Sequence, residues 1–268
     1  MSGTGGPVGL GTAAALSRPA ELCPGVRVLF TGRPGGVSGG SFGTLNLSGR
    51  VGDDPAAVAD NRGRVLRAIG PRPRRLAWMR QVHGAGVAYV AAVPVGGAPG
   101  QEGEDADGQP EADAAFTDSP EVAVGVLAAD CAPVLVADPA AGLVGAAHAG
   151  RPGMAAGVVP ALVAAMAEAG ADPARMHAII GPSICGRCYE VPAAMRDEVA
   201  AAAPGSACET RKGTPGLDLR AGLRGQLAAL GVSRLSDDLR CTAETAELFS
   251  YRRDGQTGRF AGLIWLAP

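Results

Sequence analysis

A cysteine and two histidines stand where apolar runs of this chain give way to turns. Cys131 lies in the stretch AADCAP, His148 in GAAHAG, and His83 has a similar setting in QVHG. The chain contains only these two histidines and one other. One thiolate and two imidazoles would leave a fourth coordination position open, which suits a catalytic zinc ion better than a structural one.

Each of these residues also has a simpler interpretation. A lone buried histidine is often a hydrogen-bonded core residue, and a lone cysteine is often an apolar filler. Cys131 and His148 are 17 residues apart across an expected strand–turn–strand, which can bring both to one sheet edge. His177 directly precedes an apolar run without glycine beside it, so we interpret it as structural.

A glycine-rich loop at residues 31–41 follows an expected strand at 26–30. Such a loop turns tightly and can expose backbone N–H groups. With Arg33, residues 32–43 could therefore form a phosphate site through these N–H groups. The alternative is a plain turn.

Two cysteines form a C-x-x-C pair, Cys185 and Cys188. This spacing occurs in redox motifs and in half-sites for zinc. Neither a second C-x-x-C nor a thioredoxin-like pattern accompanies it, so we expect a loop that lines the substrate site, with redox chemistry as the alternative. Cys23, Cys208 and Cys241 have no ligand-like neighbours in the sequence.

The composition indicates a soluble globular protein. The chain has 268 residues, of which 47% are hydrophobic, and a net charge of −2; this length suits one large α/β domain or two small ones. The arginines at 72, 74 and 75 lack interleaved aromatics, so we expect a solvated turn and no nucleic-acid partner. No apolar run approaches the ~20 residues that span a bilayer.

Cysteine usage and the N-terminal segment indicate the compartment. The six cysteines are irregularly spaced in a large chain, which does not resemble a disulfide framework. The first 20 residues lack the basic region of a secretory signal. We therefore expect a cytoplasmic protein with reduced thiols.

Strand-like and helix-like segments alternate along the chain, which predicts an α/β fold. We expect residues 1–22 to be a disordered tail and residues 23–268 one catalytic domain, with a mobile acidic loop at 94–113. Helices are expected from Asp53-Asp54-Pro55 onward and at 153–169, 192–203 and 217–230. Strands are expected at 26–30, 76–79, 87–90, 122–127, 133–137, 143–147, 178–180 and 263–266.

The chain resembles the laccase-domain family, whose members were once described as polyphenol oxidases. Motifs in the family's order run from about residue 26 to residue 268. They are 35–38 (GGVS), 45–47 (LNL), 51–55 (VGDDP), 61–62 (NR), 81–84 (QVHG), 129–133 (ADCAP), 147–150 (AHAG), 180–184 (IGPSI), 189–191 (YEV), 217–219 (LDL), 241–242 (CT) and 249–254 (FSYRRD). The family includes zinc-dependent purine nucleoside phosphorylases and a peptidoglycan-editing factor.

The resemblance implies a single domain with mixed β-sheet layers flanked by helices. It also implies that His83, Cys131 and His148 bind the metal beside a pocket for a purine nucleoside and phosphate. The substrate-binding residues that it suggests are Arg33, Asn46, Arg62, Tyr189 and Arg252. Asp130 and Glu190 are candidates for acid–base catalysis.

Two positions depart from the family's pattern. The family usually has Trp-Arg-Gly after His-Ala-Gly, whereas this chain has Arg151-Pro152-Gly153. The family also usually has histidine before Val-Gly-Asp-Asp, where this chain has Arg50. Both departures fall near the expected pocket, so they bear on the choice of substrate.

The leading functional hypothesis is zinc-dependent phosphorolysis of purine nucleosides, together with the adenosine deamination found in related members. One rival is a hydrolase that edits peptidoglycan precursors, with Cys131 as nucleophile and His148 as base. Another is oxidation of phenols by copper. Multicopper chemistry needs about ten histidines, and this chain has three. A single copper ion in the same three-ligand site remains as the alternative.

Overall fold

Three consecutive apolar strands form the centre of the molecule. The computed structural model describes residues 18–92 and 109–267. In β6 (Val122–Ala128), β7 (Ala132–Asp138) and β8 (Leu143–Ala149) every residue is buried. These strands belong to two different sheets. Strands buried on both faces read as continuous apolar runs, as they do here.

The first sheet has five strands in the order β1-β2-β13-β6-β3. Strand β13 lies between β2 and β6 and pairs antiparallel with both, whereas β3 pairs parallel with β6. The bounds of the strands not yet given are β1 Ala20–Cys23, β2 Val26–Phe30, β3 Arg75–Ala77 and β13 Phe260–Leu266.

The second sheet has six strands in the order β12-β9-β7-β8-β5-β4. Its centre is antiparallel, and the outer pairs β12/β9 and β4/β5 are parallel. The bounds of the remaining strands are β4 Val87–Tyr89, β5 Ala114–Thr117, β9 His177–Ile180 and β12 Arg234–Asp237. Strands β10 (Ala207–Glu209) and β11 (Pro215–Leu217) form a separate hairpin.

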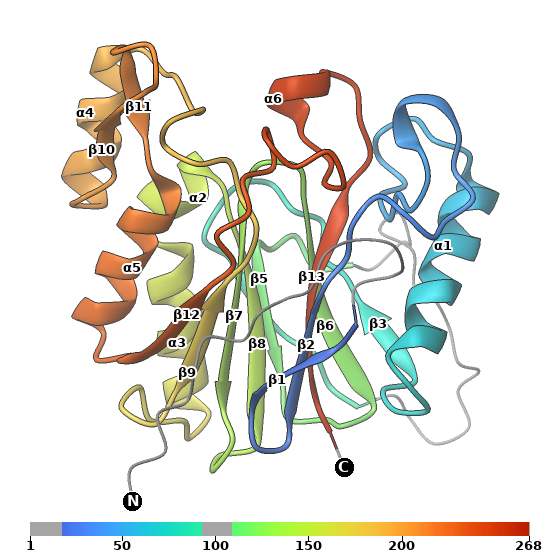
Figure 1. Cartoon of the computed structure of the whole chain (residues 1–268). Helices are drawn as coiled ribbons and strands as arrows, with labels where there is room; N and C mark the ends of the chain where they lie inside the picture. Colours follow the sequence, from blue (N-terminus) through green and yellow to red (C-terminus); the bar gives the residue numbers. More distant parts are fainter. Residues whose placement is uncertain (1–17, 93–108, 268) are drawn as a thin grey trace, which may run out of the picture.

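The two sheets pack face to face, and helices cover their outer faces (Figure 1). Alternate side chains of β7 point to opposite sides. Leu135 joins the apolar cluster between the sheets, and Val134 joins the cluster under the helices. Around β6, Leu127 contributes to a third cluster that includes Val65 of the helix α1. These layers confirm the expected mixed sheets flanked by helices.

Six α-helices are assigned within the described residues. Helix α1 covers the five-stranded sheet, while α2, α3, α4 and α5 lie on the side of the six-stranded sheet (Figure 1). Their bounds are α1 Pro55–Ala68, α2 Arg151–Ala155, α3 Val158–Glu168, α4 Ala193–Ala202, α5 Leu219–Ala229 and α6 Tyr251–Asp254. The Asp54 side chain caps α1 by accepting a hydrogen bond from the Ala56 N–H, as the sequence predicts.

The structure differs from the sequence prediction in one helix and in the N-terminal tail. The helix expected at 153–169 is two helices, because Gly157 adopts φ +81° between α2 and α3. Strand β1 begins at Ala20, inside the expected tail, and pairs with β2 across a turn containing Gly25. The rest of that tail, residues 1–17, lies outside the described residues.

The acidic loop expected at 94–113 lies mostly outside the described residues, which stop at 92 and resume at 109. Its last residues are not a surface loop. Ala112 and Asp113 are buried, because the chain here runs alongside Arg80 and Gly86 with backbone hydrogen bonds to both.

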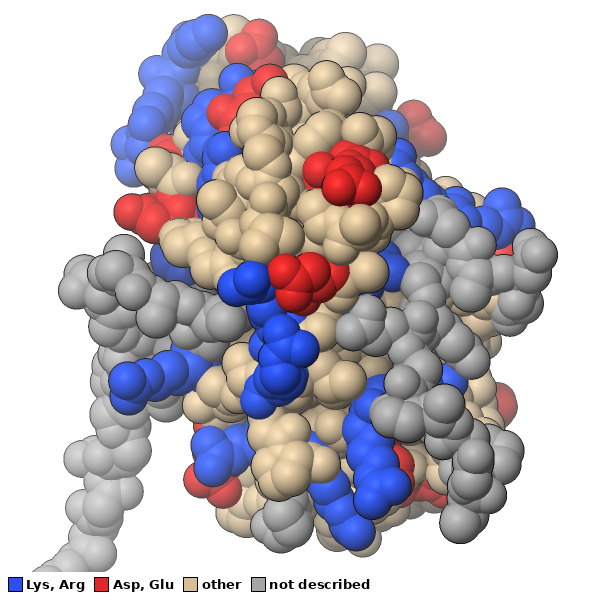
Figure 2. All heavy atoms as spheres, turned by 90° about the vertical axis from the view of Figure 1, so that its right-hand side faces the viewer, with Lys and Arg blue, Asp and Glu red and all other residues tan. Residues whose placement is uncertain are grey.

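On the face that carries α1, basic and acidic side chains are interspersed (Figure 2). The arginines noted in the sequence belong to this pattern. Arg72 and Arg74 both pair with Glu121, at 3.2 and 3.1 Å. Within the described residues, no helix has both the length and the apolar character needed to cross a bilayer.

Candidate metal centre and active site

The fold brings the three predicted metal ligands together at one edge of the sheets. His83 lies in the turn after β3, Cys131 in the turn between β6 and β7, and His148 near the end of β8. Their sulfur and nitrogen atoms all lie within 4.8 Å of one another. The Cys131 Sγ is 3.9 Å from the His83 Nε2, and the two imidazole rings meet edge to face at 4.8 Å.

Asp113 holds the ring of His148 and the backbone turn that carries His83. Its Oδ1 is 2.9 Å from the His148 Nδ1 and accepts a hydrogen bond from the His83 N–H, also at 2.9 Å. Its Oδ2 accepts from the backbone N–H groups of Val82 and Gly84. The bond to Nδ1 leaves the Nε2 of His148 for a metal, as in many zinc sites whose histidines are held by a carboxylate.

The turn at His83 depends on the same carboxylate. His83 has φ +62°, a conformation that few residues other than glycine adopt. Three successive N–H groups donate to one buried aspartate, and this compensates for the unfavourable backbone. Sequence reasoning missed Asp113, although an acidic residue immediately before the apolar run 114–117 was a usable signal.

Gly150 has no side chain, and this leaves room for the three ligand atoms to converge. A Cβ added to Gly150 would lie 2.8 Å from the Cys131 Sγ and 3.0 Å from the His83 Cδ2. The donor set of one sulfur and two nitrogens is one that zinc and copper both accept. The residues present therefore fit a metal ion with a fourth position open to substrate or water.

The electrostatics of the trio favour a charged pair. Burial opposes ionisation of Cys131, but His148 and His83 lower its pKa to about 6. Burial also opposes protonation of His148, but Cys131 and Asp113 raise its pKa to about 9. At neutral pH a thiolate therefore faces an imidazolium, and a metal ion that binds both must displace the proton from His148.

The trio lines a cavity of about 430 Å³. This volume is in the range of ligand pockets. The predicted residues Tyr189, Arg252 and Asp130 also line it. The full lining is Ser48, Arg50, Val51, Gln81, His83, Leu127, Ala128, Ala129, Asp130, Cys131, His148, Arg151, Ile184, Tyr189, Leu219, Tyr251, Arg252 and Arg259.

Four arginines give this cavity a positive lining: Arg50, Arg151, Arg252 and Arg259. The first two are the positions at which the chain departs from the family's usual pattern. Arg252 also stands over the ring of Tyr189, with 4.9 Å between its Cζ and the ring centroid. Guanidinium groups suit phosphate and other oxyanions.

Asp130 connects two segments of the chain that lie beside the cavity. Its carboxylate accepts hydrogen bonds from the hydroxyls of Thr242 and Ser250 and from the N–H of Arg252, at 2.6 to 2.7 Å. Its backbone has φ +109°. The carboxylate thus ties the segment 242–252 to the turn that carries Cys131, which is a positioning role.

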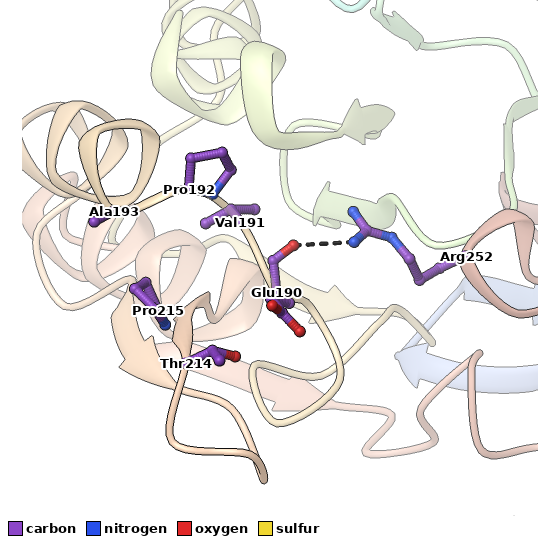
Figure 3. Close-up of a pocket in the computed structure, with 7 residues that line it drawn as sticks. All are labelled: Glu190, Val191, Pro192, Ala193, Thr214, Pro215 and Arg252. Atoms are coloured by element: carbon purple, nitrogen blue, oxygen red, sulfur yellow. Dashed lines mark hydrogen bonds between the residues drawn. The ribbon is translucent and has the colours of Figure 1, made fainter.

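Arg252 also borders a second cavity, of about 520 Å³, which is drawn in Figure 3. Its Nη1 donates to the backbone carbonyl of Glu190 at 3.0 Å. The predicted acid–base residue Glu190 lines this second cavity and is absent from the lining of the first.

The structure places three of the predicted substrate-binding residues elsewhere. Arg33 pairs with Asp254 at 3.1 Å and donates to the Gly43 carbonyl. Asn46 is fully buried, and its side chain bonds to Asp53 and to the backbone of residues 48 and 259. Arg62 is buried against Trp78 and donates to the Leu47 carbonyl. All three brace the fold around the glycine-rich loop.

The backbone N–H groups of the glycine-rich loop are partly engaged within the protein. Many of them already donate within the protein: Arg33 to Glu247, Gly36 and Ser38 to Thr44, Val37 to Asn61, and Phe42 to Gly39. No residue from 32 to 43 lines the metal cavity. A phosphate site at this loop stays a prediction, and it would lie outside the metal cavity.

Comparison with known proteins identifies the family. The profile of the family described as "Multi-copper polyphenol oxidoreductase laccase" matches residues 27–267. The chain belongs to this family. Its three histidines are too few for the several copper centres that the description names.

Relatives of the chain are named for a different reaction from the one in the family's description. A protein of Streptomyces coelicolor named purine nucleoside phosphorylase is 53% identical over 237 residues, covering 88% of this chain and 94% of the relative. A protein of Corynebacterium glutamicum with the same name is 46% identical over 243 residues, covering 90% and 94%.

Solved structures of this family have the same architecture. YlmD from Geobacillus stearothermophilus superposes with a TM-score of 0.82 at 34% identity, covering 93% of this chain and 94% of that one. Protein NMB0706 of Neisseria meningitidis superposes with a TM-score of 0.80 at 37% identity, covering 93% and 98%. The likeness therefore spans the whole described fold.

Proposed function

We propose that this chain is a zinc-dependent purine nucleoside phosphorylase, which converts a purine nucleoside and phosphate to the free base and ribose 1-phosphate. One observation carries the proposal: the three metal-ligand side chains and four arginines line the same cavity. The names of the relatives agree with this reaction.

His83, Cys131 and His148 would hold the zinc ion, and Asp113 would keep the Nε2 of His148 directed at it. When bound, the ion supplies a Lewis acid at the open position of the site. Two imidazoles and one thiolate leave it a net charge of about +1. Tyr189 and Leu219 provide an apolar wall against which a purine ring can pack.

The arginines would bind phosphate beside the ribose. In phosphorolysis a phosphate oxygen bonds to C1′ of the ribose as the bond from C1′ to the base nitrogen breaks. The base leaves with the bonding electrons and takes up a proton. The sugar carries developing positive charge, so a phosphate dianion held by Arg151 and Arg252 would stabilise it.

We propose positioning roles for the two acid–base candidates, Asp130 and Glu190. The Asp130 carboxylate already accepts three hydrogen bonds, so we assign it the positioning of Arg252 and of the segment around Ser250. Glu190 lines the neighbouring cavity and contacts Arg252 through its backbone carbonyl. We propose that it orients this arginine from outside the metal cavity.

The test is to incubate the purified protein with inosine, guanosine or adenosine, with and without phosphate, and to measure base and ribose 1-phosphate. We expect turnover that requires phosphate, and a loss of more than about 100-fold in kcat/KM in Cys131→Ala. The matched control is Cys208→Ala, which removes a thiol outside the cavity. Full turnover in Cys131→Ala, or base release without phosphate, would refute the proposal.

The same preparation separates the rival functions. Elemental analysis without added metal distinguishes zinc from copper, and ammonia release from adenosine reports deamination. If Cys131 is a free catalytic nucleophile, as peptidoglycan editing by this pair would require, an alkylating agent modifies it at once. If it is bound to zinc, modification waits until a chelator is added.

A further inference from the structure

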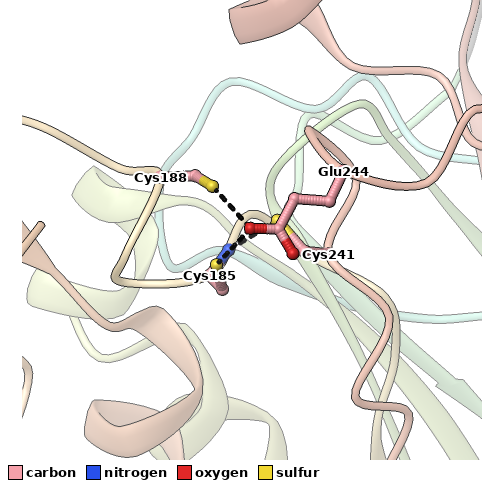
Figure 4. Close-up of side chains that lie close together, drawn as sticks. All are labelled: Cys185, Cys188, Cys241 and Glu244. Atoms are coloured by element: carbon pink, nitrogen blue, oxygen red, sulfur yellow. Dashed lines mark hydrogen bonds between the residues drawn. The ribbon is translucent and has the colours of Figure 1, made fainter. Parts of the chain in front are cut away.

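A second group of potential metal ligands lies outside the cavity. Cys185, Cys188, Cys241 and Glu244 place their sulfur and carboxylate atoms within 4.8 Å of one another (Figure 4). The Cys188 Sγ is 3.0 Å from the Glu244 Oε1, and the Cys185 Sγ is 3.9 Å from the same oxygen. The sequence indicated no partner for Cys241, and the fold supplies three.

The arrangement follows from the pairing of two strands. Strands β9 and β12 are parallel neighbours, so the segments that follow them leave the same edge of the sheet. A bridge between Ser183 and Cys241 continues this pairing. The C-x-x-C segment then turns back, with the Cys188 N–H donating to the Cys185 carbonyl at 2.9 Å. The two halves of the cluster are thereby brought together from positions more than 50 residues apart.

Local contacts hold the four side chains of the cluster together. The backbone N–H of Cys185 donates to the Cys241 Sγ, 3.3 Å away. Arg211 forms an ion pair with Glu244, the same carboxylate that lies beside the two C-x-x-C thiols. Three thiols and a carboxylate thus present four donor atoms to one point, and a divalent ion that binds there would displace the thiol protons.

We propose that Cys185, Cys188, Cys241 and Glu244 form a second zinc site with a structural role. Three sulfurs and one carboxylate oxygen complete a tetrahedral set, so no position is left for substrate. Zinc is favoured over magnesium and calcium because the donors are mainly thiolates.

The position of the cluster explains what such an ion would stabilise. Ile184 and Tyr189 flank the C-x-x-C segment and line the metal cavity. Thr242, next to Cys241, donates to Asp130. A zinc ion at the cluster would therefore fasten two walls of the active-site cavity to each other without taking part in the reaction.

The experiment is metal quantification on full-length protein purified under reducing conditions and dialysed against metal-free buffer. We expect two zinc ions per chain in the wild type and one each in Cys188→Ser and Cys131→Ala. The double variant is expected to hold none. Cys208→Ser is the matched control and keeps two, because Cys208 is a half-buried thiol near Gly186 but outside the cluster.

The ion that remains in Cys188→Ser reports that this variant is folded, because the ligands of the first site come from three separate segments. A second measurement replaces zinc with Co²⁺ in the Cys131→Ala background. The sulfur-to-metal charge-transfer absorption should decrease in Glu244→Gln less than in Cys188→Ser, because only the latter removes a thiolate.

One zinc ion in the wild type, lost entirely in Cys131→Ala, would overturn the proposal. So would two ions in Cys188→Ser, or a disulfide between Cys185 and Cys188 in the reduced preparation. None of these measurements uses a nucleoside. Failure of phosphorolysis would therefore leave the second zinc site standing, and the reverse also holds.

Discussion

Replacing Asp113 by asparagine should loosen the proposed catalytic zinc site while leaving the ligands themselves in place. Four N–H donors converge on this buried carboxylate, two on each oxygen. Asparagine has the same shape but only one acceptor oxygen, so two donors would face its NH₂ group. Each buried donor left without an acceptor costs about 1–3 kcal/mol, so the substitution should cost about 2–6 kcal/mol of unfolding free energy.

Part of that cost should appear as weaker zinc binding, because the asparagine no longer holds both the His148 ring and the turn that carries His83. Loss of a group that orients a ligand lowers metal affinity by about 10- to 100-fold. We would measure the zinc dissociation constant by competition with a colorimetric chelator, and stability by urea unfolding of the zinc-free protein. Since the proposed second site also binds zinc, both are measured in the Cys188→Ser background.

The matched control is Asp138→Asn. Asp138 is also fully buried and accepts hydrogen bonds from Ala140 and Asp172, but it lies at the opposite end of β7 from Cys131. The Asp138→Asn protein should be less stable than its parent but should bind zinc with the same affinity. Our reasoning is refuted if Asp113→Asn binds zinc as tightly as its parent, or if Asp138→Asn weakens zinc binding equally.

Three further predictions concern single contacts. Gly150→Ala puts a Cβ 2.8 Å from the Cys131 Sγ and should lower zinc affinity at least about tenfold; unchanged affinity by chelator competition would contradict this. Arg151→Ala should raise the KM for phosphate about tenfold or more, from the loss of ~1.5–3 kcal/mol of charge-assisted hydrogen bonding, and raise the KM for nucleoside less, as initial rates would reveal. Burial opposes ionisation of Asp138, but hydrogen bonds from the Asp172 N–H and Arg175 lower its pKa. The stabilisation by this carboxylate should therefore be present above the unfolded pKa of about 3.9 and be lost below it. Urea unfolding should show that Asp138→Asn loses less unfolding free energy at pH 3 than at pH 7.

The sequence located the metal trio because each ligand follows or ends an apolar run, and buried strands end at sheet edges. The sequence analysis did not single out Asp113, since the role of this residue depends on three N–H groups that converge only in the folded turn at His83. Asn46 and Arg62 lie in motifs that match the family, and Arg33 lies in the glycine-rich loop. Their substrate-binding roles stay predictions, because a motif does not show that these side chains bond to the protein around that loop.

The sequence did not predict the cysteine cluster for a related reason. Its halves are joined by the parallel pairing of β9 and β12, and β12 is a short strand of alternating exposure that the apolar pattern did not predict. The larger strands β6, β7 and β8 were predicted well, because continuous burial produces continuous apolar sequence. Pairing between distant strands leaves no such local signature.

Strand β13 sits in the middle of the five-stranded sheet although it follows the other four strands of that sheet along the chain. During translation, the edges of β2 and β6 that pair with β13 stay unpaired until residue 266 has left the ribosome. Exposed edges of this kind recruit other strands, so nascent chains of this protein should depend on chaperones more than their final stability suggests. A chain truncated before Phe260 would lack the strand that joins the two halves of the sheet.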